Sequence, residues 1–279
     1  MSEAVLQVNN LSVGYAEHCV IKNLSFQINK GELVGIIGCN GAGKSTLLKT
    51  LRGLLPRQNG EIFFEKKELA CYSDKELAKK VAYLQQHMEI GFGYTAKEIV
   101  LAGRYPYISW WQTESKADEI LALECMKYTG TYDLADKLIN AVSGGQKQRI
   151  LLAKVLAQQT PILFLDEPTT GLDVVYKEEI FRFAKELVAM GKTVLMVVHE
   201  LQLAAKYCSR ILLLGQGRLL ADGSADEVFT EQNLSKAYAA DIEIIRNPVN
   251  NSLEITTHIN NAATAEKIAL LHKICADSL

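Results

Sequence analysis

The sequence contains no long run of apolar residues. No stretch approaches the roughly 18 consecutive apolar residues that a membrane-spanning helix requires. The first residues, Met1 to Ala4, have neither the basic patch nor the apolar core of a secretion signal. We therefore expect the chain to remain in the cytoplasm and to associate with a membrane only through a partner.

Closely spaced cysteines are also absent. The six cysteines are scattered, and no two of them have the spacing of a metal-binding pair. This pattern argues against a zinc site and favours reduced thiols over disulfides. Cys39 lies within a glycine-rich loop, where it is interpreted as a tolerated small residue, with a redox-sensitive thiol as the alternative.

Neither sign of charge is in excess. The chain has 30 basic and 32 acidic residues, which gives a formal net charge of −2. A chain with this balance lacks an overall electrostatic footprint for nucleic acid, so we predict no nucleic-acid partner. Its 279 residues provide enough material for one large domain or two small ones.

The most informative stretch is the glycine-rich loop itself. Residues 38–46 read GCNGAGKST and fit the phosphate-loop pattern G-x-x-x-x-G-K-[ST]. A buried strand is predicted before the loop at Leu33–Ile37, and a helix with inward-facing leucines after it at Ser45–Leu51. Backbone N–H groups and a helix start would then surround the phosphates of a nucleotide. Lys44 would bind the β- and γ-phosphates, and Ser45 would offer its hydroxyl to Mg²⁺.

Strand and helix patterns alternate along most of the chain, which predicts a parallel sheet with helices on both faces. Ligands of such sheets gather at the carboxyl ends of the strands. Capping boxes at Ser73 with Glu76 and Thr95 with Glu98 predict two helix starts. The predicted strands lie within 5–28 (around a turn near 13–16) and at 61–64, 81–84, 162–167, 193–198 and 210–214, with a mainly helical block at about 87–159 and a tail, 241–279, of two strands and a helix packed on the core.

Polar residues follow three of these strands. Asp166 and Glu167 end one strand, where Asp166 can hold Mg²⁺ and Glu167 can accept a proton from an attacking water; a turn-capping role is the alternative. His199 ends the next strand and could hydrogen-bond a γ-phosphate, unless it is structural. Gln86 follows the strand at 81–84 and could position water or Mg²⁺.

A second anion site is predicted at Val142–Gln146. Ser143 and two glycines open a helix there, and helix starts bind anions. A chain with one phosphate loop needs no second grip on the same nucleotide, so this site is expected to contact ATP held by another copy. Here the sequence resembles the ATP-binding cassette (ABC) ATPases, whose signature is L-S-G-G-Q; Val142 replaces the leucine.

The resemblance covers roughly residues 3–240 and implies an α/β fold: a P-loop NTPase core with a parallel sheet, an N-terminal antiparallel β subdomain and a helical signature subdomain inserted at about 87–160. Residues 241–279 form a C-terminal extension. Tyr15 is implied to stack on adenine, although packing on an edge strand is the other reading of its position. The implied catalytic residues are Glu167, His199 and Gln86; the implied metal ligands are Ser45, Gln86 and Asp166; and the implied nucleotide-binding residues are Tyr15, Gly38, Asn40, Gly41, Gly43, Lys44, Ser45, Thr46, Ser143, Gly144, Gly145 and Gln146.

The same resemblance implies partners. Two subunits would close head-to-tail around two ATP molecules with Mg²⁺, with Asp173 touching the opposite subunit, and would open after hydrolysis. The groove beside Gln86 would pass this motion to transmembrane permease subunits, and indirectly to a substrate-binding protein. The chain would then lie on the cytoplasmic face of the cell membrane, held there by the permease.

Three shorter segments narrow the class. Residues 103–107, 199–205 and 219–228 resemble ATPases of bacterial importers for iron–siderophore complexes, haem and cobalamin. Iron–siderophore is the first choice because it is the commonest cargo of the group, with haem or cobalamin as alternatives. The aromatic run Tyr105–Trp111 is interpreted either as part of a docking surface or as core packing. A rival from another class is a soluble non-transport ABC ATPase, but those carry long coiled-coil insertions or two cassettes.

Overall fold

The N-terminal part of the chain forms an antiparallel sheet. In this computed structural model, which describes residues 3–15, 18–85, 91, 93–249, 253–258 and 261–276, the sheet has the strand order β2-β1-β4-β5. The turn predicted at residues 13–16 was wrong for Val13 to Tyr15, which continue β1, and Ala16 falls outside the described residues. Register shifts between Leu11 and Gly14 explain the difference, because a bulge takes up irregular residues without ending the strand. The strands are β1 (Ala4–Tyr15), β2 (His18–Asn29), β4 (Asn59–Phe64) and β5 (Lys67–Glu68).

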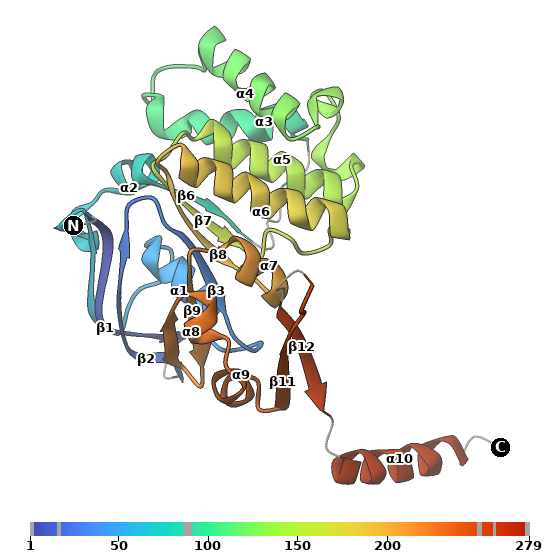
Figure 1. Ribbon diagram of the computed structural model, residues 1–279. Helices are drawn as coiled ribbons and strands as arrows, with labels where there is room; N and C mark the ends of the chain where they lie inside the picture. The colour runs from blue at the N-terminus through green and yellow to red at the C-terminus, as the bar shows by residue number, and fades with distance from the viewer. Residues whose placement is uncertain are drawn as a thin grey trace.

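A six-stranded sheet forms the centre of the described chain, in the order β10-β9-β3-β8-β7-β6 (Figure 1). All of its neighbouring pairs are parallel except β9 with β10. The carboxyl ends of the parallel strands therefore meet at one edge, which confirms the predicted α/β class. The strands are β3 (Leu33–Ile37), β6 (Val81–Leu84), β7 (Ile162–Asp166), β8 (Thr193–Val197), β9 (Arg210–Gly215) and β10 (Arg218–Gly223).

Most helices begin at the residues that local chemistry favours. Both predicted capping boxes are present, Ser73 with Glu76 and Thr95 with Glu98, and Ser143 with Gln146 forms another at the start of α5. The α-helices are α1 (Lys44–Leu51), α2 (Asp74–Lys80), α3 (Ala96–Leu101), α4 (Lys116–Tyr128), α5 (Gly144–Ala157), α6 (Val174–Ala189), α7 (Leu201–Tyr207), α8 (Ala225–Val228), α9 (Glu231–Tyr238) and α10 (Asn261–Ala276). The short 3-10 helices are η1 (Leu69–Cys71), η2 (Ala102–Tyr107), η3 (Tyr132–Leu134) and η4 (Ile139–Ala141).

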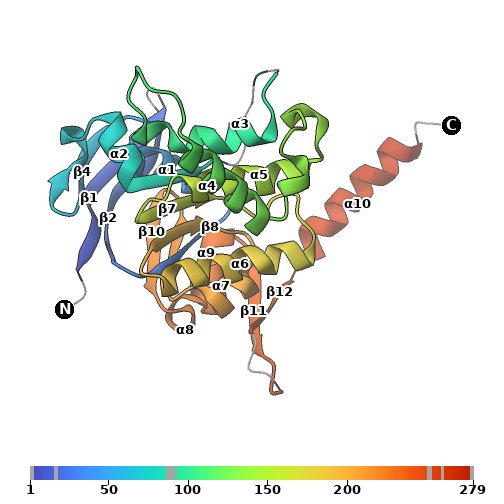
Figure 2. The ribbon, with the colours of Figure 1, turned by 90° about the horizontal axis from the view of Figure 1, so that it is seen from above.

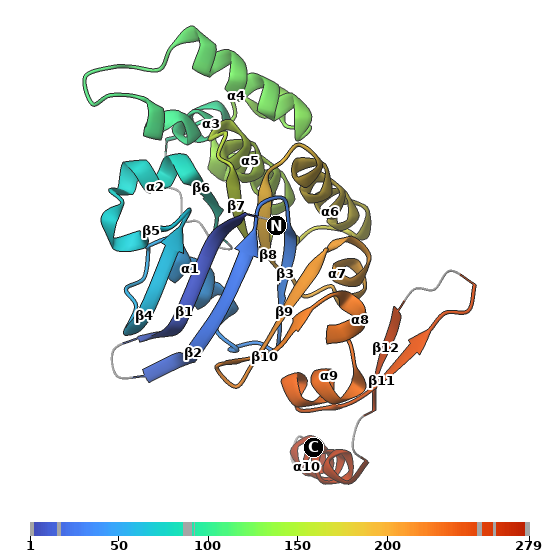
Figure 3. The same cartoon turned by 60° about the vertical axis from the view of Figure 1, so that its left-hand side comes forward.

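The two faces of the central sheet belong to different cores. On β3, Leu33 and Ile37 pack with the helices of one cluster, whereas Val34 and Ile36 pack with α1 and the antiparallel sheet. This alternation follows from the two-residue period of a strand, which sends successive side chains to opposite faces. Helices cover one face of the central sheet, and α1 with the antiparallel sheet covers the other (Figure 3). The side chains of the central strands are therefore buried on both faces, and this packing fixes where the strands end.

The helices α3, α4 and α5 lie between β6 and β7 in the chain and contact one another beside the sheet. At the other end, β11 (Asp241–Arg246) pairs with β12 (Leu253–His258), and this hairpin contacts α7 and α9. The hairpin thus packs on the core, whereas α10 stands apart from the body of the chain (Figures 1 and 2). Within the described ranges, every helix is too short or too polar to cross a membrane.

Candidate functional site

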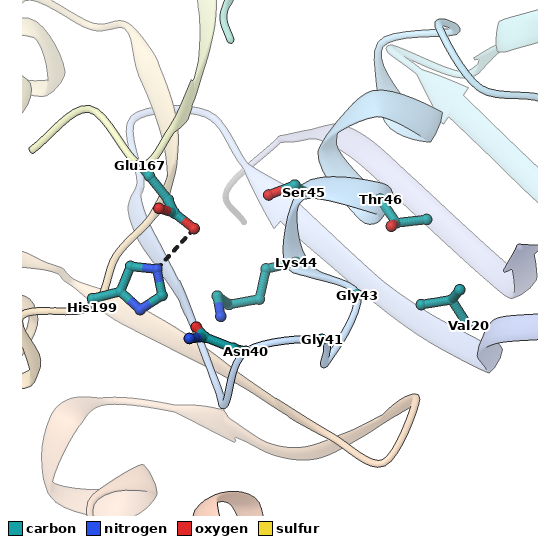
Figure 4. A pocket seen from close by; sticks show the side chains of 9 residues that line it. All are labelled: Val20, Asn40, Gly41, Gly43, Lys44, Ser45, Thr46, Glu167 and His199. Carbon is teal, nitrogen blue, oxygen red and sulfur yellow. Dashed lines mark ion pairs between the residues drawn. The ribbon is translucent and has the colours of Figure 1, made fainter. Parts of the chain in front are cut away.

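A cleft of 680 Å³ opens at the carboxyl ends of the central strands. It lies where the loop after β3 faces the loops after β7 and β8, and Figure 4 shows Lys44, Glu167 and His199 around it. Two residue groups that are more than 120 positions apart in the sequence therefore meet at one place, because β3, β8 and β7 are neighbours. The residues lining the cleft are Val20, Asn40, Gly41, Gly43, Lys44, Ser45, Thr46, Glu167 and His199.

The loop before α1 requires glycine at specific positions. Gly38 has φ +145°, and a Cβ added there would lie 2.1 Å from the carbonyl oxygen of Leu214. Gly43 has φ +95°, and its added Cβ would lie 2.8 Å from Ile21. Only glycine avoids both the backbone strain and the overlap. The loop therefore curves tightly against β9 and β2, and both the loop and the start of α1 line the cleft, where a helix start can bind an anion.

Lys44 is buried at the first position of α1. Its ammonium donates hydrogen bonds to the carbonyl oxygens of Gly38, at 2.8 Å, and Cys39, at 3.0 Å. Burial lowers the pKa of Lys44, while the carboxylates of Glu167 and Asp166 oppose that shift. Because little solvent surrounds this ammonium, it interacts strongly with an anion. Phosphate oxygens can replace the carbonyl oxygens of Gly38 and Cys39 as its hydrogen-bond acceptors.

Ser45 and Asp166 supply the oxygen atoms that Mg²⁺ prefers. The Ser45 hydroxyl donates a hydrogen bond to Asp166 Oδ1 at 2.7 Å, so a hydroxyl and a carboxylate converge beside the phosphate loop. Burial raises the pKa of Asp166, and its hydrogen bonds with Ser45 and Tyr83 partly offset that effect. Within the described ranges no group of three or more His, Cys, Asp and Glu side chains gathers as metal ligands. These residues fit an Mg²⁺ that also takes oxygens from a nucleotide, rather than a metal held by protein alone.

The side chain of Tyr83 was not among the predicted site residues. Its hydroxyl donates a hydrogen bond to Asp166 Oδ2 at 2.9 Å, so the carboxylate is held from both sides. Burial beside Asp166 raises the pKa of Tyr83, which keeps its hydroxyl protonated. The sequence signal was faint, because only the pairing of β6 with β7 places residue 83 beside residue 164.

Glu167 and His199 form a pair in the wall of the cleft. His199 Nε2 lies 2.8 Å from Glu167 Oε1, and the Thr170 hydroxyl donates to Glu167 Oε2 at 3.2 Å. Glu167 has φ +49°, a strained conformation for a non-glycine residue that tends to occur at functional sites. The carboxylate is therefore oriented toward the cleft by two neighbours, as a group that takes a proton from water should be.

A second carboxylate braces these loops. Glu200 follows His199, accepts a hydrogen bond from the Thr169 hydroxyl at 2.9 Å and forms an ion pair with Lys177 at 2.7 Å. Burial opposes ionisation of Glu200, but Lys177 and Thr169 overcome it, and the pKa of Glu200 is lowered. The segments that carry Glu167 and His199 are thus tied to each other and to α6. Sequence patterns gave no signal for this contact.

Among the other predicted residues that the structure describes, Tyr15, Ser143 to Gln146 and Asp173 do not line the cleft. Tyr15 is 49% exposed at the end of β1, next to the β1–β2 hairpin, and Gln86 falls outside the described residues. Ser143 and Gly144 are exposed at the start of α5, where Ser143 and Gln146 cap the helix; none of residues 143–146 lines the cleft in the described structure. Gly145 packs beside Leu172, and Asp173 caps α6 through the N–H groups of residues 175 and 176.

Comparison with known proteins identifies the family. Residues 21–170, more than half of the chain, match the family described as ABC transporter. The chain is 36% identical to the ferric enterobactin transport ATP-binding protein FepC of Escherichia coli, over 89% of this chain and 93% of that protein. It is 37% identical to the hemin import ATP-binding protein HmuV of Thermobifida fusca, over 88% and 85% of the two chains. It is 38% identical to the manganese transport system ATP-binding protein MntB of Bacillus subtilis, over 88% and 96%.

The fold agrees with solved cassettes. The dimeric structure of MJ0796, a bacterial ABC transporter cassette, superposes with a TM-score of 0.72 at 29% identity and covers 79% of this chain and 98% of that one. The phosphate loop, the paired carboxylates and the capped glycine pair thus occur in the fold that these cassettes share. The chain belongs to the ABC transporter family and is one of its ATP-hydrolysing cassettes.

Proposed function

We propose that this chain powers a bacterial importer by hydrolysing Mg-ATP in the cleft between the phosphate loop and Glu167. The observation that carries the proposal is the convergence of Lys44, Ser45, Asp166, Glu167 and His199 at one strand edge. When bound, Mg²⁺ neutralises charge on the phosphates, and Ser45 and Asp166 would hold it with Gln86. Lys44 exchanges its carbonyl acceptors for phosphate oxygens, and Glu167 accepts the proton of the attacking water, oriented by His199.

The second half of each ATP site comes from another copy of the chain. Residues 143–146 do not line the cleft, and Ser143 and Gly144 are exposed at the start of α5. A head-to-tail homodimer would place this start, with residues 144 and 145, over the γ-phosphate held by the partner's loop. Tyr15 would stack on the adenine ring of the bound ATP. The dimeric structure of the MJ0796 cassette supports the pairing of two copies in general. In this account residues 1–240 are the ATPase domain and 241–279 an extension.

A separate cleft of 560 Å³ is the proposed docking site for the permease. It lies between α2, η2 and α5 and includes Gln85, Tyr105 and Lys154 in its wall. Beyond it, Trp110 and Trp111 are 91% and 69% exposed, which favours a docking role over core packing for the aromatic run. Exposed tryptophan and tyrosine beside basic residues are typical of protein-binding hot spots.

The cargo is proposed to be an iron complex, with iron–siderophore first and haem or cobalamin as alternatives. FepC and HmuV support the first two, while the equally similar MntB shows that overall identity does not select the cargo. The chain would bind to its permease on the cytoplasmic face of the cell membrane. A cargo-binding protein would deliver the cargo to that permease.

The proposal is tested by uptake. Cells that lack the chain are given labelled ferric siderophores, haem, cobalamin or manganese separately, after complementation with the native chain, Glu167→Gln or Glu186→Gln. Glu186 is a matched control, because its carboxylate accepts a hydrogen bond from Tyr128 outside the cleft. We expect native and Glu186→Gln chains to restore uptake of one iron complex, and Glu167→Gln to restore none.

Other results would change the assignment. If the native chain restored uptake of manganese alone, the proposed cargo would be manganese, and the proposal that the chain powers an importer would stand. The importer proposal would be contradicted if cells that lack both the chain and any second importer still took up every cargo normally. The double variant Trp110→Ala/Trp111→Ala tests docking in the same cells: it should keep ATPase activity and lose uptake.

A further inference from the structure

A buried glutamine joins α5 to the loop that carries Glu167. Gln148, in the second turn of α5, is only 9% exposed, and its Nε2 donates a hydrogen bond to the carbonyl oxygen of Pro168 at 3.1 Å. Pro168 directly follows Glu167 and is itself buried. A buried carbonyl and a buried amide that have both left water need a hydrogen bond within the protein, so this contact fixes the two segments to each other.

The loop makes a turn immediately after Glu167. The N–H of Thr170 donates to the carbonyl oxygen of Glu167 at 3.2 Å, which closes a turn with Pro168 and Thr169 at its centre. Glu167 has φ +49° at the start of this turn, and a non-glycine residue keeps that conformation only where its surroundings enforce it. Gln148 binds the central peptide of the turn, so removal of its amide should allow Glu167 to move.

The helix that carries Gln148 is itself well packed. Leu151 and Leu152, one turn further along α5, are buried. A Cβ added at Gly145 would lie 3.5 Å from Leu172, so α5 meets the loop after Glu167 at a second point. The amide of Gln148 therefore extends from a fixed support toward the turn.

We infer that Gln148 is a positioning residue for Glu167: its amide fixes the turn so that the Glu167 carboxylate stays directed at the attacking water. A general base must lie within hydrogen-bond reach of the proton that it accepts, and small displacements from the productive geometry lower the rate. The inference rests on the proposed role of Glu167 as the proton acceptor and is independent of the cargo.

The test removes the amide and keeps the size of the side chain. In Gln148→Met, kcat for ATP hydrolysis should fall about tenfold because the carboxylate is less well oriented. KM for ATP and the affinity for Mg-ADP in calorimetry should stay within about twofold, since the phosphate loop is untouched. The thermal midpoint should fall by about 2–4 °C, because the Pro168 carbonyl loses its donor. Gln148→Asn, whose amide is one methylene shorter, should show the same loss of kcat.

A matched control separates positioning from stability. Asn233, on α9, donates from Nδ2 to the carbonyl oxygen of Val228, also at 3.1 Å, and does not line the cleft. Asn233→Leu should lower the thermal midpoint by a similar amount and keep the native kcat. In a Glu167→Gln chain, adding Gln148→Met should change the remaining slow hydrolysis of labelled ATP less than twofold, because Gln148 acts through Glu167.

Three results would overturn the inference. They are a native kcat in both Gln148 variants, an equal loss of kcat in Asn233→Leu, and a further tenfold loss when Gln148→Met is added to Glu167→Gln. Failure of the native chain itself to hydrolyse Mg-ATP would instead overturn the proposed function.

Discussion

The phosphate loop and the start of α5 share one local feature, a glycine-containing helix start, but the two helix starts differ in their surroundings. Each is a helix start with glycines in or just before its first turn, which suits the binding of an anion. At α1 the chain encloses the device: Lys44 is buried, and Gly38 lies against Leu214. At α5 the device is open, since Gly144 is exposed and an added Cβ would meet nothing within 4 Å. The difference indicates that a single chain encloses the phosphate loop, whereas the start of α5 would be enclosed only by the surface of another molecule.

The largest expected effect breaks the enclosed site. Lys44→Ala removes the buried ammonium, and we expect ATP hydrolysis to fall about 1,000-fold because charge-assisted contacts to the phosphates are lost. A single chain should also bind Mg-ADP much more weakly, measured by calorimetry. The thermal midpoint should be recorded as a control, because Lys44 also bonds Gly38 and Cys39. Normal ADP binding in this variant would remove Lys44 from the site.

The next effect breaks the open site and leaves the enclosed one intact. Gly144→Asp places a carboxylate in open space at the start of α5. The helix dipole stabilises a negative charge at this position, but the carboxylate repels phosphate. We expect hydrolysis to fall about 100-fold, which is the order of losing one transition-state donor. Binding of Mg-ADP to the single chain and the thermal midpoint should stay at native values. Light scattering should show that ATP no longer drives dimer formation. Hydrolysis at the native rate would mean that this helix start does not meet the nucleotide.

Local chemistry and long-range contacts explain what the sequence could predict. The capping boxes at Ser73 and Thr95 were predicted because their partners lie three residues away. The meeting of the phosphate loop with Glu167 was predicted because parallel strands end at a common edge. The Tyr83–Asp166 hydrogen bond spans 83 positions and depends on which strand lies beside β7, which no local pattern encodes. The bulges that continue β1 past Leu11 were missed for the same reason, since they depend on the partner strand.

A smaller effect sharpens the description of the enclosed site. Tyr83→Phe removes the hydroxyl that supports Asp166, and we expect the Mg²⁺ concentration for half-maximal hydrolysis to rise about tenfold, as for other groups that orient a metal ligand. Tyr72→Phe is a matched control, because its hydroxyl bonds the carbonyl of Phe64 in the antiparallel sheet. An equal Mg²⁺ requirement in both variants would show that Asp166 needs no support from β6.

The smallest effect concerns the brace behind the enclosed site. Glu200→Gln weakens the contacts with Thr169 and Lys177, and we expect the free energy of unfolding to fall by about 1 kcal/mol, because the pair is partly exposed and solvent screens it. The pKa of Glu200 is lowered in the folded chain, so its stabilisation is present above the ordinary glutamate pKa and is lost as pH falls through the lowered value. Urea unfolding of both chains should therefore show the difference at pH 7 and its decline as the pH is lowered stepwise below about 4.5.

Hydrolysis should change less than threefold in Glu200→Gln, because Glu167 keeps its own contacts with His199 and Thr170. A difference that persists unchanged in acid would assign the effect to packing, and a loss of hydrolysis as large as that of Gly144→Asp would place Glu200 in the reaction itself.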